Sequence, residues 1–493
     1  MITNSLWDMP MAMLLNETQC YQAICSRDHR FDGRFFFAVN TTGIYCRPIC
    51  SAKTPNLNHC QFFPSAAAAE AKGFRPCLRC RPELAPGNAS VDAVSRLAQR
   101  AVGLIEEGFL HEANLQQLAE HMGISERHLR RVFHKEFGVN LIGFVQTQRL
   151  LLAKRLLTET SIPITEVALN AGFASLRRFN SLFKNRYGFK PSHFRRAMPL
   201  TEPLSSLVFR LSYRPPLDWQ ALMDFISERA IPGVEDVNNG IYQRTVYLNY
   251  QGQWHSGWIT AEFLSNAAVV KITLANELGK VIVPVLRRLK QLFDLNCHPE
   301  EIAASLGSLA KKHPGLRVPG AFDEFEMAVR AILGQQVSVK AARTLAGRFA
   351  KYFGQFQTTP FTALSYIFPN PTQVAMATPE QIAALGITLS RAKSIIGLAK
   401  AIAAGQLTLA ANVDVPSTLM QLRNLPGIGE WTAQYIAMRA LAWPDAFPAA
   451  DLGIMKALEI TSPQQAKIYA EAWRPWRSYA VMHLWLSLKE KKL

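Results

Sequence analysis

Seven of the eight cysteines in this 493-residue chain lie within its first 80 residues, and their spacing restricts how that segment can fold. Four of them form two close pairs, Cys46-x3-Cys50 and Cys77-x2-Cys80, with 26 residues between the pairs. Two such pairs can close a tetrahedral thiolate site, and bound zinc lets a module fold whose apolar core is too small by itself. The N-terminus shows no basic region or cleavage site of a secretion signal, so we expect one zinc ion rather than disulfides.

The remaining cysteines and one histidine leave alternatives open. His59 and Cys60 lie between the two pairs and are rival ligands. Cys20, Cys25 and Cys297 fall outside the pattern, and we expect them to be small, buried apolar side chains. From spacing alone, a purely structural zinc site is the favoured interpretation of four such cysteines.

The sequence around the cysteine pairs, FFFAVNTTGIYCRPIC and GFRPCLRCRPE, resembles the N-terminal domain of bacterial Ada adaptive-response regulators over about residues 20 to 83. This resemblance implies that Cys46 is also a nucleophile, which takes the methyl group of a DNA methylphosphotriester. Four thiolates around Zn²⁺ leave a net negative formal charge, which methylation of one thiolate reduces. Weaker repulsion from phosphates should then strengthen DNA binding.

Basic residues flank the four cysteines and are candidate phosphate contacts, although each could equally be a solvated surface charge. They are Arg47, Arg75, Arg79 and Arg81.

The whole chain is basic, with a formal net charge of +17 from 54 Lys and Arg against 37 Asp and Glu. Such a surplus favours a polyanionic partner, and nucleic acid is a stronger candidate than a membrane surface. No apolar run approaches the roughly 18 residues that span a bilayer. We therefore expect a cytoplasmic, nucleoid-associated protein with no membrane partner.

Length and shifts in composition predict several domains and a multidomain α+β fold. Pro86 and Gly87 mark the end of the turn-rich, cysteine-bearing segment. RTVYLNY and AVVKITLA alternate as half-buried strands do, whereas Ala- and Leu-rich segments of helical period dominate from about Val283. The predicted domains are a zinc module (8–86), an all-α DNA-binding domain (87–198), an α+β subdomain (207–285) and a mostly helical domain (286–493).

One pattern occurs twice in the second of these domains. NLQQLAEHMGISERHLRRVFHKEFG predicts a helix, a tight turn at Gly123, and a second helix with Ser125 as its N-cap. ITEVALNAGFASLRRFNSLFKNRYG repeats the arrangement with Gly172 and Ser175. A plain helical bundle is the alternative, but two capped turns followed by basic helices argue against it.

With the closing YGFKPSHFRR, these repeats resemble the AraC-type double helix-turn-helix domain over roughly residues 92 to 198. The resemblance implies two recognition helices, which begin near Glu126 and Leu176 and enter DNA major grooves. An activator of this type has promoter DNA and RNA polymerase as its partners. The side chains expected to face the groove are Arg127, His128, Arg131, Arg177, Arg178 and Asn180.

Residues 424–451, NLPGIGEWTAQYIAMRALAWPDAFPAAD, place Pro-Gly-Ile-Gly between two helical patterns. This arrangement predicts a helix-hairpin-helix, in which Gly427 and Gly429 let the backbone approach a DNA phosphate, often with help from a monovalent cation. The motif by itself indicates only a grip on DNA. Asp451 lies 22 residues past Gly429, and a helix N-cap is the alternative role for it.

The hairpin and the aspartate resemble the helix-hairpin-helix DNA glycosylases. Similarity to the 3-methyladenine DNA glycosylase II family extends over about residues 207 to 486 and includes GLRVPGAFDEFEMAVRAILGQQVS and YAEAWRPWRSYAVMHLW. It implies that the Asp451 carboxylate stabilises positive charge on the sugar as the N-glycosidic bond breaks. Trp431 stands where strand-cutting relatives carry a lysine, and no cluster-binding cysteine follows Cys297, so we expect a monofunctional hydrolytic enzyme.

The same resemblance implies a base pocket formed by Trp431, Tyr435, Trp485 and Phe225, with ordinary core packing as the alternative for each. An electron-rich aromatic pocket would attract a flipped-out cationic base such as 3-methyladenine. Gln336 is the candidate wedge that fills the vacated duplex position, where some relatives have leucine.

The expected function is excision of alkylated bases coupled to a methyl-accepting sensor and transcriptional activator. The alternative is a transcription regulator whose glycosylase-like half only binds DNA. Besides zinc and a monovalent cation at the hairpin, no small-molecule cofactor is expected. The Pro-Cys-His-Arg motif of O6-alkylguanine transferases is absent from the sequence, so we expect no repair of that lesion.

Overall fold

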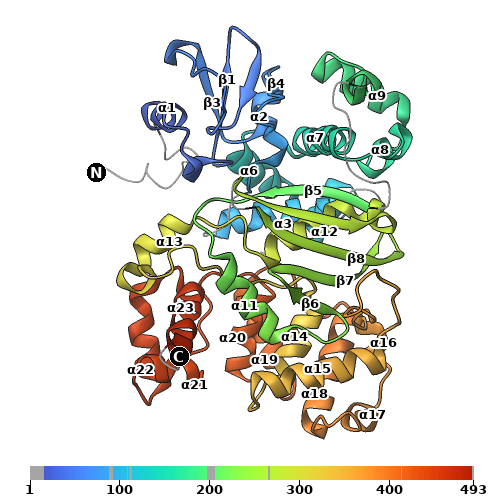
Figure 1. Cartoon of the computed structure of the whole chain (residues 1–493), viewed down its shortest axis with the longest axis vertical. Coiled ribbons are helices and arrows are strands. Elements are labelled where there is room, and N and C mark those ends of the chain that lie inside the picture. The colour runs from blue at the N-terminus through green and yellow to red at the C-terminus, as the bar shows by residue number, and fades with distance from the viewer. Residues whose placement is uncertain are drawn as a thin grey trace. The chain divides into compact units, whose positions relative to one another are not determined.

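The computed structural model describes residues 16–87, 93–107, 109, 114–196, 206–264, 267–411 and 413–490 (Figure 1). The chain divides into two compact units, Met1–Arg214 with Gly279–Ile282, and Pro215–Leu278 with Val283–Leu493. Strands and helices occur in both units, which confirms the multidomain α+β fold class. No helix in the described ranges is long and apolar enough to cross a membrane.

The zinc module at the start of the first unit is built on a small sheet with strand order β3-β1-β2-β4. Strands β2 and β4 pair in parallel, with Tyr45 opposite Pro76, so Cys46 at the end of β2 and Cys77 just after β4 lie side by side. The other strand pairs are antiparallel. The elements are α1 (Glu17–Cys25), β1 (Phe36–Val39), β2 (Ile44–Cys46), β3 (Cys60–Phe63), α2 (Ala66–Ala71) and β4 (Arg75–Pro76).

The helical part of the first unit contains both predicted helix-turn-helix motifs. Gly123 and Gly172 adopt φ of +72° and +83° in the turns, a region that glycine enters without the steric cost of a side chain. Ser125 and Ser175 cap the second helices, as the sequence predicts. The elements are α3 (Ala93–Glu106), α5 (Leu115–His121), α6 (Glu126–Phe137), α7 (Leu141–Glu159), α8 (Ile164–Asn170), α9 (Leu176–Tyr187), α10 (Pro191–Arg196) and β5 (Ser206–Ser212).

The zinc module and the helical part share one hydrophobic core, to which Phe36 of β1 and Phe133 of α6 both belong. A buried carboxylate crosses the same boundary. Glu70 of α2 accepts hydrogen bonds from the Tyr45 hydroxyl at 3.0 Å and from the Thr147 hydroxyl of α7 at 3.2 Å. Arg186 of α9 lies 3.2 Å from Glu70 in an ion pair. The zinc module and the helical part are therefore packed against each other within the first unit.

The second unit begins with α11 (Trp219–Arg229) and antiparallel strands in the order β9-β8-β7-β6. RTVYLNY lies in β7 and AVVKITLA overlaps β9, so both predicted strands are confirmed. Strands β7 and β8 form a hairpin in which Tyr250 lies opposite Gln253. The strands are β6 (Glu235–Asn238), β7 (Ile241–Tyr250), β8 (Gln253–Leu264) and β9 (Val269–Ala275).

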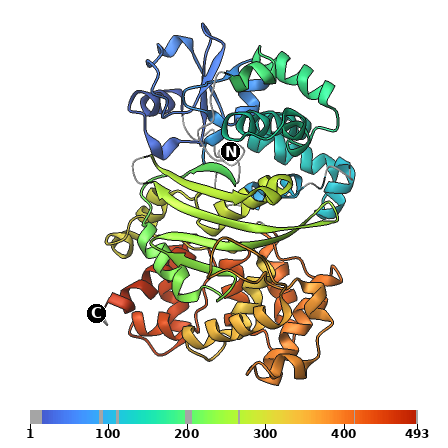
Figure 2. The same ribbon diagram turned by 45° about the vertical axis from the view of Figure 1, so that its right-hand side comes forward.

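Helices form the rest of the second unit (Figure 2). The helix-hairpin-helix consists of α19 and α20, and the short helix α21 begins immediately after Asp451. The longer helices are α12 (Ile282–Leu292), α13 (Pro299–Leu306), α14 (Glu324–Leu333), α15 (Val339–Phe353), α18 (Leu389–Ala403), α19 (Val415–Arg423), α20 (Glu430–Arg439), α22 (Pro463–Ala470) and α23 (Arg477–Glu490). The shorter ones are α16 (Pro371–Ala375), α17 (Pro379–Ala383) and α21 (Leu452–Ala457).

Candidate active site and zinc centre

The four predicted zinc ligands lie together at one end of the small sheet. The sulfur atoms of Cys46, Cys50, Cys77 and Cys80 all lie within 4.8 Å of one another. Three of these cysteines are buried and Cys80 is partly exposed. Four thiolates at this spacing are the donor set that a structural zinc ion takes, so the predicted ligand set and one bound Zn²⁺ are confirmed.

The other predictions about cysteines have mixed outcomes. His59 and Cys60 are not part of the ligand cluster found among the described residues. Cys20 and Cys297 are buried as expected, whereas the prediction of a buried Cys25 is wrong, because the last residue of α1 faces solvent.

The arginines near the cysteines divide into two groups. Arg47 is buried and its guanidinium donates to the Asp32 carboxylate, so it is not available as a surface phosphate contact. Arg81 likewise donates to Glu83 at 3.0 Å and to Glu159 at 2.9 Å. Arg75 and Arg79 are exposed. The structure thus reduces the four candidates to these two exposed side chains.

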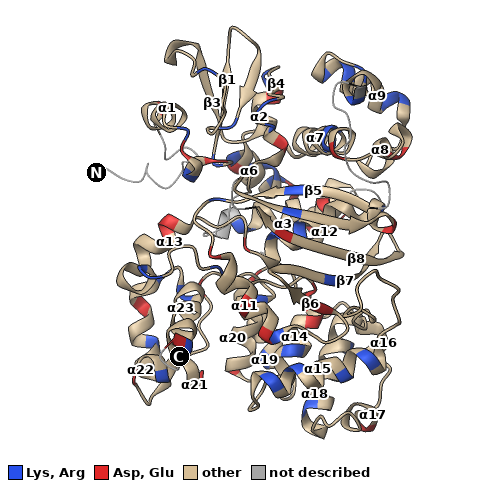
Figure 3. Ribbon diagram, in the orientation of Figure 1, with Lys and Arg blue, Asp and Glu red and all other residues tan. Residues whose placement is uncertain are grey.

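The side chains predicted to read DNA lie on the two expected recognition helices, α6 and α9. Arg127, Arg131, Arg177, Arg178 and Asn180 are exposed, and His128 is partly exposed. His128 Nδ1 lies 3.0 Å from the Arg131 guanidinium, so these two side chains form one polar group on α6. Figure 3 shows Lys and Arg positions, in blue, along the α9 ribbon. The geometry thus presents both sets of side chains at the surface of the first unit.

The hairpin between α19 and α20 leaves backbone amides open at the start of α20. Gly429 occupies the N-cap position, and no side chain caps the helix there. Gly427 has φ of +79°, and a Cβ at this position would lie 2.0 Å from the Ser394 hydroxyl oxygen. A helix N-terminus with free amides is suited to bind a phosphate. The exposed Gln336 lies in the turn between α14 and α15 with φ of +54°.

Asp451 occupies the helix N-cap position that the sequence left as an alternative, and it also lines a pocket. Its Oδ1 accepts a hydrogen bond from the backbone N–H of Ile454 at 3.0 Å, so it caps α21. The indole N–H of Trp485 donates to Oδ1, and that of Trp431 donates to Oδ2, both at 2.9 Å. These three donors fix the orientation of the carboxylate at the edge of a pocket.

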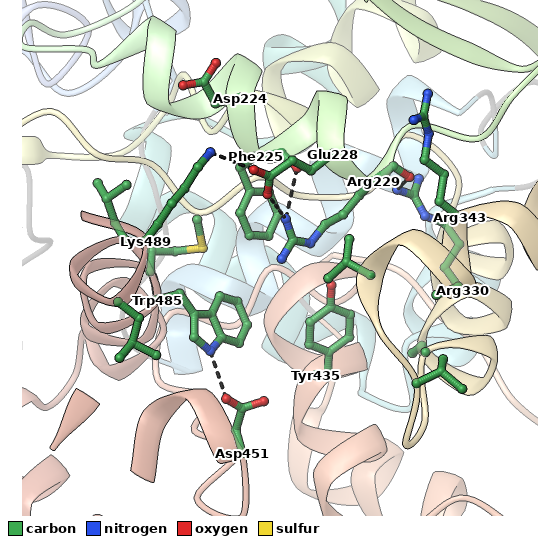
Figure 4. Close-up of a pocket in the computed structure, with 18 of the residues that line it drawn as sticks. Asp224, Phe225, Glu228, Arg229, Arg330, Arg343, Tyr435, Asp451, Trp485 and Lys489 are labelled. Atoms are coloured by element: carbon green, nitrogen blue, oxygen red, sulfur yellow. Dashed lines mark hydrogen bonds and ion pairs between the residues drawn. The ribbon is translucent and has the colours of Figure 1, made fainter. Parts of the chain in front are cut away.

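That pocket has a volume of about 540 Å³ and lies between α11, α20 and α23 (Figure 4). All four predicted aromatic side chains line it together with Asp451. The rings of Phe225 and Trp485 are nearly parallel, with centroids 6.1 Å apart, and Trp431 stacks on Tyr435 at 5.3 Å. A cavity of this size lined by aromatic faces can hold a purine base.

Two arginines of this site were missed by the sequence analysis. The Arg229 guanidinium lies 3.7 Å from the centroid of the Phe225 ring, and an Arg439 nitrogen donates to the Tyr435 hydroxyl at 2.9 Å. Burial raises the pKa of Tyr435, but Arg439, Arg229 and Arg330 outweigh it and the pKa is lowered. Each missed arginine follows its aromatic partner by four residues on one helix, a spacing that could have identified both.

A glycine also belongs to this site. A Cβ at Gly453 would lie 2.9 Å from Oδ1 of Asp451 and 3.1 Å from the Trp485 ring. Only glycine therefore leaves room for the bond between Trp485 and Asp451. The sequence shows a glycine in the LGIMK segment after Asp451. The need for glycine there becomes clear only from the packing of α23 against α21.

Four family models match successive parts of the chain. They describe the metal binding domain of Ada (residues 19–83), a helix-turn-helix domain (118–197), the AlkA N-terminal domain (208–323) and the HhH-GPD superfamily of base excision DNA repair proteins (329–478). These matches confirm the resemblances on which the sequence predictions rest.

Several known proteins are similar in sequence. The probable bifunctional transcriptional activator/DNA repair enzyme AlkA of Mycobacterium tuberculosis is 36% identical over 486 residues, which cover 96% of each chain. DNA-3-methyladenine glycosylase 2 of Escherichia coli is 38% identical over 56% of this chain and 96% of its own length. The bifunctional transcriptional activator/DNA repair enzyme AdaA of Bacillus subtilis is 33% identical over 37% of this chain and 84% of its own.

Proposed function

This chain belongs to the family of bifunctional transcriptional activator/DNA repair enzymes AlkA, and from this premise we propose how its residues repair alkylated DNA and regulate that repair. The second unit is a DNA glycosylase, and the first unit carries a zinc site and two helix-turn-helix motifs. The observation that carries the proposal is the Asp451 carboxylate, which two indole N–H groups hold at the edge of an aromatic pocket.

In the proposed reaction, a damaged base such as 3-methyladenine leaves the duplex and enters the pocket between the aromatic rings. As the N-glycosidic bond breaks, both bonding electrons go to the base and positive charge develops on the sugar. Asp451, held by two indole N–H groups, stabilises that charge. The cationic 3-methyladenine thereby leaves as a neutral base, and water adds to the sugar carbon and releases one proton to the solvent. Trp431 offers no amine for a Schiff base, which supports hydrolysis without strand cleavage.

The test is Asp451→Asn. The amide can still accept the Ile454 N–H bond that caps α21, but it lacks the negative charge. We expect release of 3-methyladenine from methylated duplex DNA to fall by on the order of 10² to 10³. Binding of undamaged DNA through Gly427 and Gly429 should remain unchanged. Release of 3-methyladenine at the wild-type rate would contradict the proposal. It would favour the alternative, a transcription regulator whose glycosylase-like half only binds DNA.

The zinc centre is the proposed methyl acceptor. Zinc held by the four cysteines would keep their thiols deprotonated. In the transfer step, Cys46 Sγ forms a bond to the methyl carbon of a phosphotriester. The methyl carbon–oxygen bond breaks, and the oxygen keeps its electrons as a phosphodiester anion. The match to the metal binding domain of Ada and the clustering of the four sulfurs support this step.

Mass spectrometry of the protein after incubation with methylated DNA tests the acceptor. We expect the adduct on Cys46 and a higher affinity for promoter DNA at one fixed salt concentration. An adduct on the more exposed Cys80 would contradict the assignment of Cys46, and equal affinity before and after methylation would contradict the switch. RNA polymerase is the proposed partner in activation, which transcription with purified polymerase would test.

A further inference from the structure

A group of buried charged side chains lies behind the base pocket. Most of these side chains form ion pairs whose charges cancel. Arg244 donates to Glu326 at 2.8 Å and lies 3.4 Å from Glu235. Arg330 donates to Glu235 at 2.8 Å and lies 3.3 Å from Glu326. Two guanidiniums and two carboxylates therefore compensate one another inside the second unit.

Arg439 is the exception in this group. Its side chain is deeply buried, with the residue only 2% exposed. Its hydrogen bonds go to uncharged oxygens, namely the carbonyls of Pro319 and Gly320 and the hydroxyl of Tyr435. Burial lowers the pKa of Arg439 to about 10, so the guanidinium still carries its proton at neutral pH. The protein therefore keeps an excess positive charge behind the pocket.

The excess charge and Asp451 contact different aromatic side chains of the pocket. The Arg439 guanidinium lies 5.0 Å from the centroid of the Phe225 ring and 5.6 Å from that of Tyr435. The Tyr435 hydroxyl points away from Asp451 (Figure 4). Because Arg439 donates to the Tyr435 oxygen, the hydroxyl hydrogen is free to donate to a base. The pocket, which Glu228, Arg229 and Arg330 also line, thus has the Asp451 carboxylate at one edge and the Arg439 guanidinium behind two of its rings.

We propose that Arg439 is a positioning residue that, through the Tyr435 hydroxyl, favours excision of uncharged damaged bases over cationic ones. The proposal rests on the glycosylase function proposed above. When the bond between sugar and base breaks, an uncharged base receives both electrons and becomes an anion until it takes up the proton released by the attacking water. A cationic base becomes neutral in the same step.

This difference predicts a specific kinetic pattern. The positive charge of Arg439 favours electron flow to the base in both reactions, so it raises the rate of bond cleavage for both. It repels a cationic base on binding, however, and has little effect on the binding of an uncharged one. Since kcat/KM compares the transition state with free enzyme and free DNA, only the uncharged base gains in kcat/KM.

The experiment compares wild-type protein with Arg439→Met on two duplexes, one with hypoxanthine as the uncharged base and one with 7-methylguanine as the cationic base. We expect kcat/KM for hypoxanthine to fall about tenfold or more. Enzymes that lose one hydrogen-bond donor to the transition state show losses of this size or larger. The value for 7-methylguanine should change less than about twofold, because slower cleavage is offset by tighter binding. Arg439→Lys retains the charge and should restore the preference.

Controls separate this role from a structural one. Arg288→Met removes a partly buried guanidinium of the second unit, which is paired with Glu324 and does not line the pocket, and should leave the ratio of the two substrates unchanged. If Arg439→Met does not fold, Tyr435→Phe tests the same path, and we expect a selective loss on hypoxanthine. Equal losses on both substrates, or no release of hypoxanthine by the wild-type protein, would overturn the inference. Release of neither base by the wild-type protein would instead contradict the proposed glycosylase function.

Discussion

Asp451 has a geometry that suits both a helix cap and the proposed stabilisation of charge on the sugar. A carboxylate at an N-cap is common because it accepts a backbone N–H bond that the helix would otherwise leave unmade. Here the same oxygen also receives the Trp485 indole, and the second oxygen receives the Trp431 indole. The sequence allowed either role, and the geometry permits both.

The first prediction concerns the indole that positions this carboxylate. Trp485→Phe keeps an aromatic ring beside Phe225 but removes the N–H bond to Asp451. We expect the single-turnover rate of 3-methyladenine release to fall about tenfold, because the carboxylate is less well fixed. Leu484→Ile, a nearly volume-conserving change at a buried neighbour on the same helix, is the matched control and should leave the rate nearly unchanged. Equal rates for wild type and Trp485→Phe would contradict a role for the indole.

The second prediction concerns Asp294, whose pKa burial raises to about 6 despite the Arg317 charge and the Tyr479 hydroxyl bond. Between about pH 4 and 6 the folded state holds a proton that the unfolded chain has released. The free energy of unfolding should therefore fall as pH rises through this range, by no more than about 3 kcal/mol, and level off above it.

Asp294→Asn tests this pH dependence, since asparagine also tolerates the φ of +50° at this position. Denaturant unfolding of both proteins should show the variant gaining stability relative to the wild type as pH rises from 4 to 7. A constant difference across that range would contradict the raised pKa.

At the scale of elements, the hairpin between α19 and α20 contains two glycines with different tasks. Gly427 has a left-handed backbone, and a Cβ at this position would clash with the Ser394 hydroxyl. Nothing lies within 4 Å of a Cβ placed at Gly429. Gly427→Ala should therefore lower the free energy of unfolding by about 1 kcal/mol or more. Gly429→Ala should leave stability unchanged and weaken DNA binding, because its methyl group stands where a phosphate would approach.

Thermal unfolding and DNA titration of both variants check this prediction, with each variant acting as the control for the other. Equal melting temperatures for the two variants would contradict the prediction that a side chain at Gly427 destabilises the fold.

At the scale of the whole molecule, the zinc site and the base pocket belong to different compact units. Each unit has its own buried core, so stability of the second should not depend on the metal. We expect a strong chelator to remove one zinc ion and unfold the zinc module, while release of 3-methyladenine changes less than about twofold. Metal analysis and base release on the same sample would measure both, and parallel loss of the two would contradict independent units.

The order of the modules, the zinc ligands, the capped helix-turn-helix motifs and the hairpin glycines could all be predicted from the sequence. Each depends on short spacing along the chain, as in the pairs Cys46-x3-Cys50 and Cys77-x2-Cys80, where local geometry brings the residues together. The prediction that Asp451 is the catalytic carboxylate rests in the same way on its distance past Gly429, together with the resemblance to known glycosylases.

Only the tertiary structure decided which charges are free and which are compensated. Arg47 is adjacent to the predicted site residue Cys46, and Arg439 lies one helical turn after Tyr435. Arg47 donates to the Asp32 carboxylate, whereas Arg439 donates to uncharged oxygens. Their partners come from segments up to 120 residues away, which no local pattern specifies. The electrostatic field at a site depends on such long-range packing, because burial removes the water that would otherwise screen each charge.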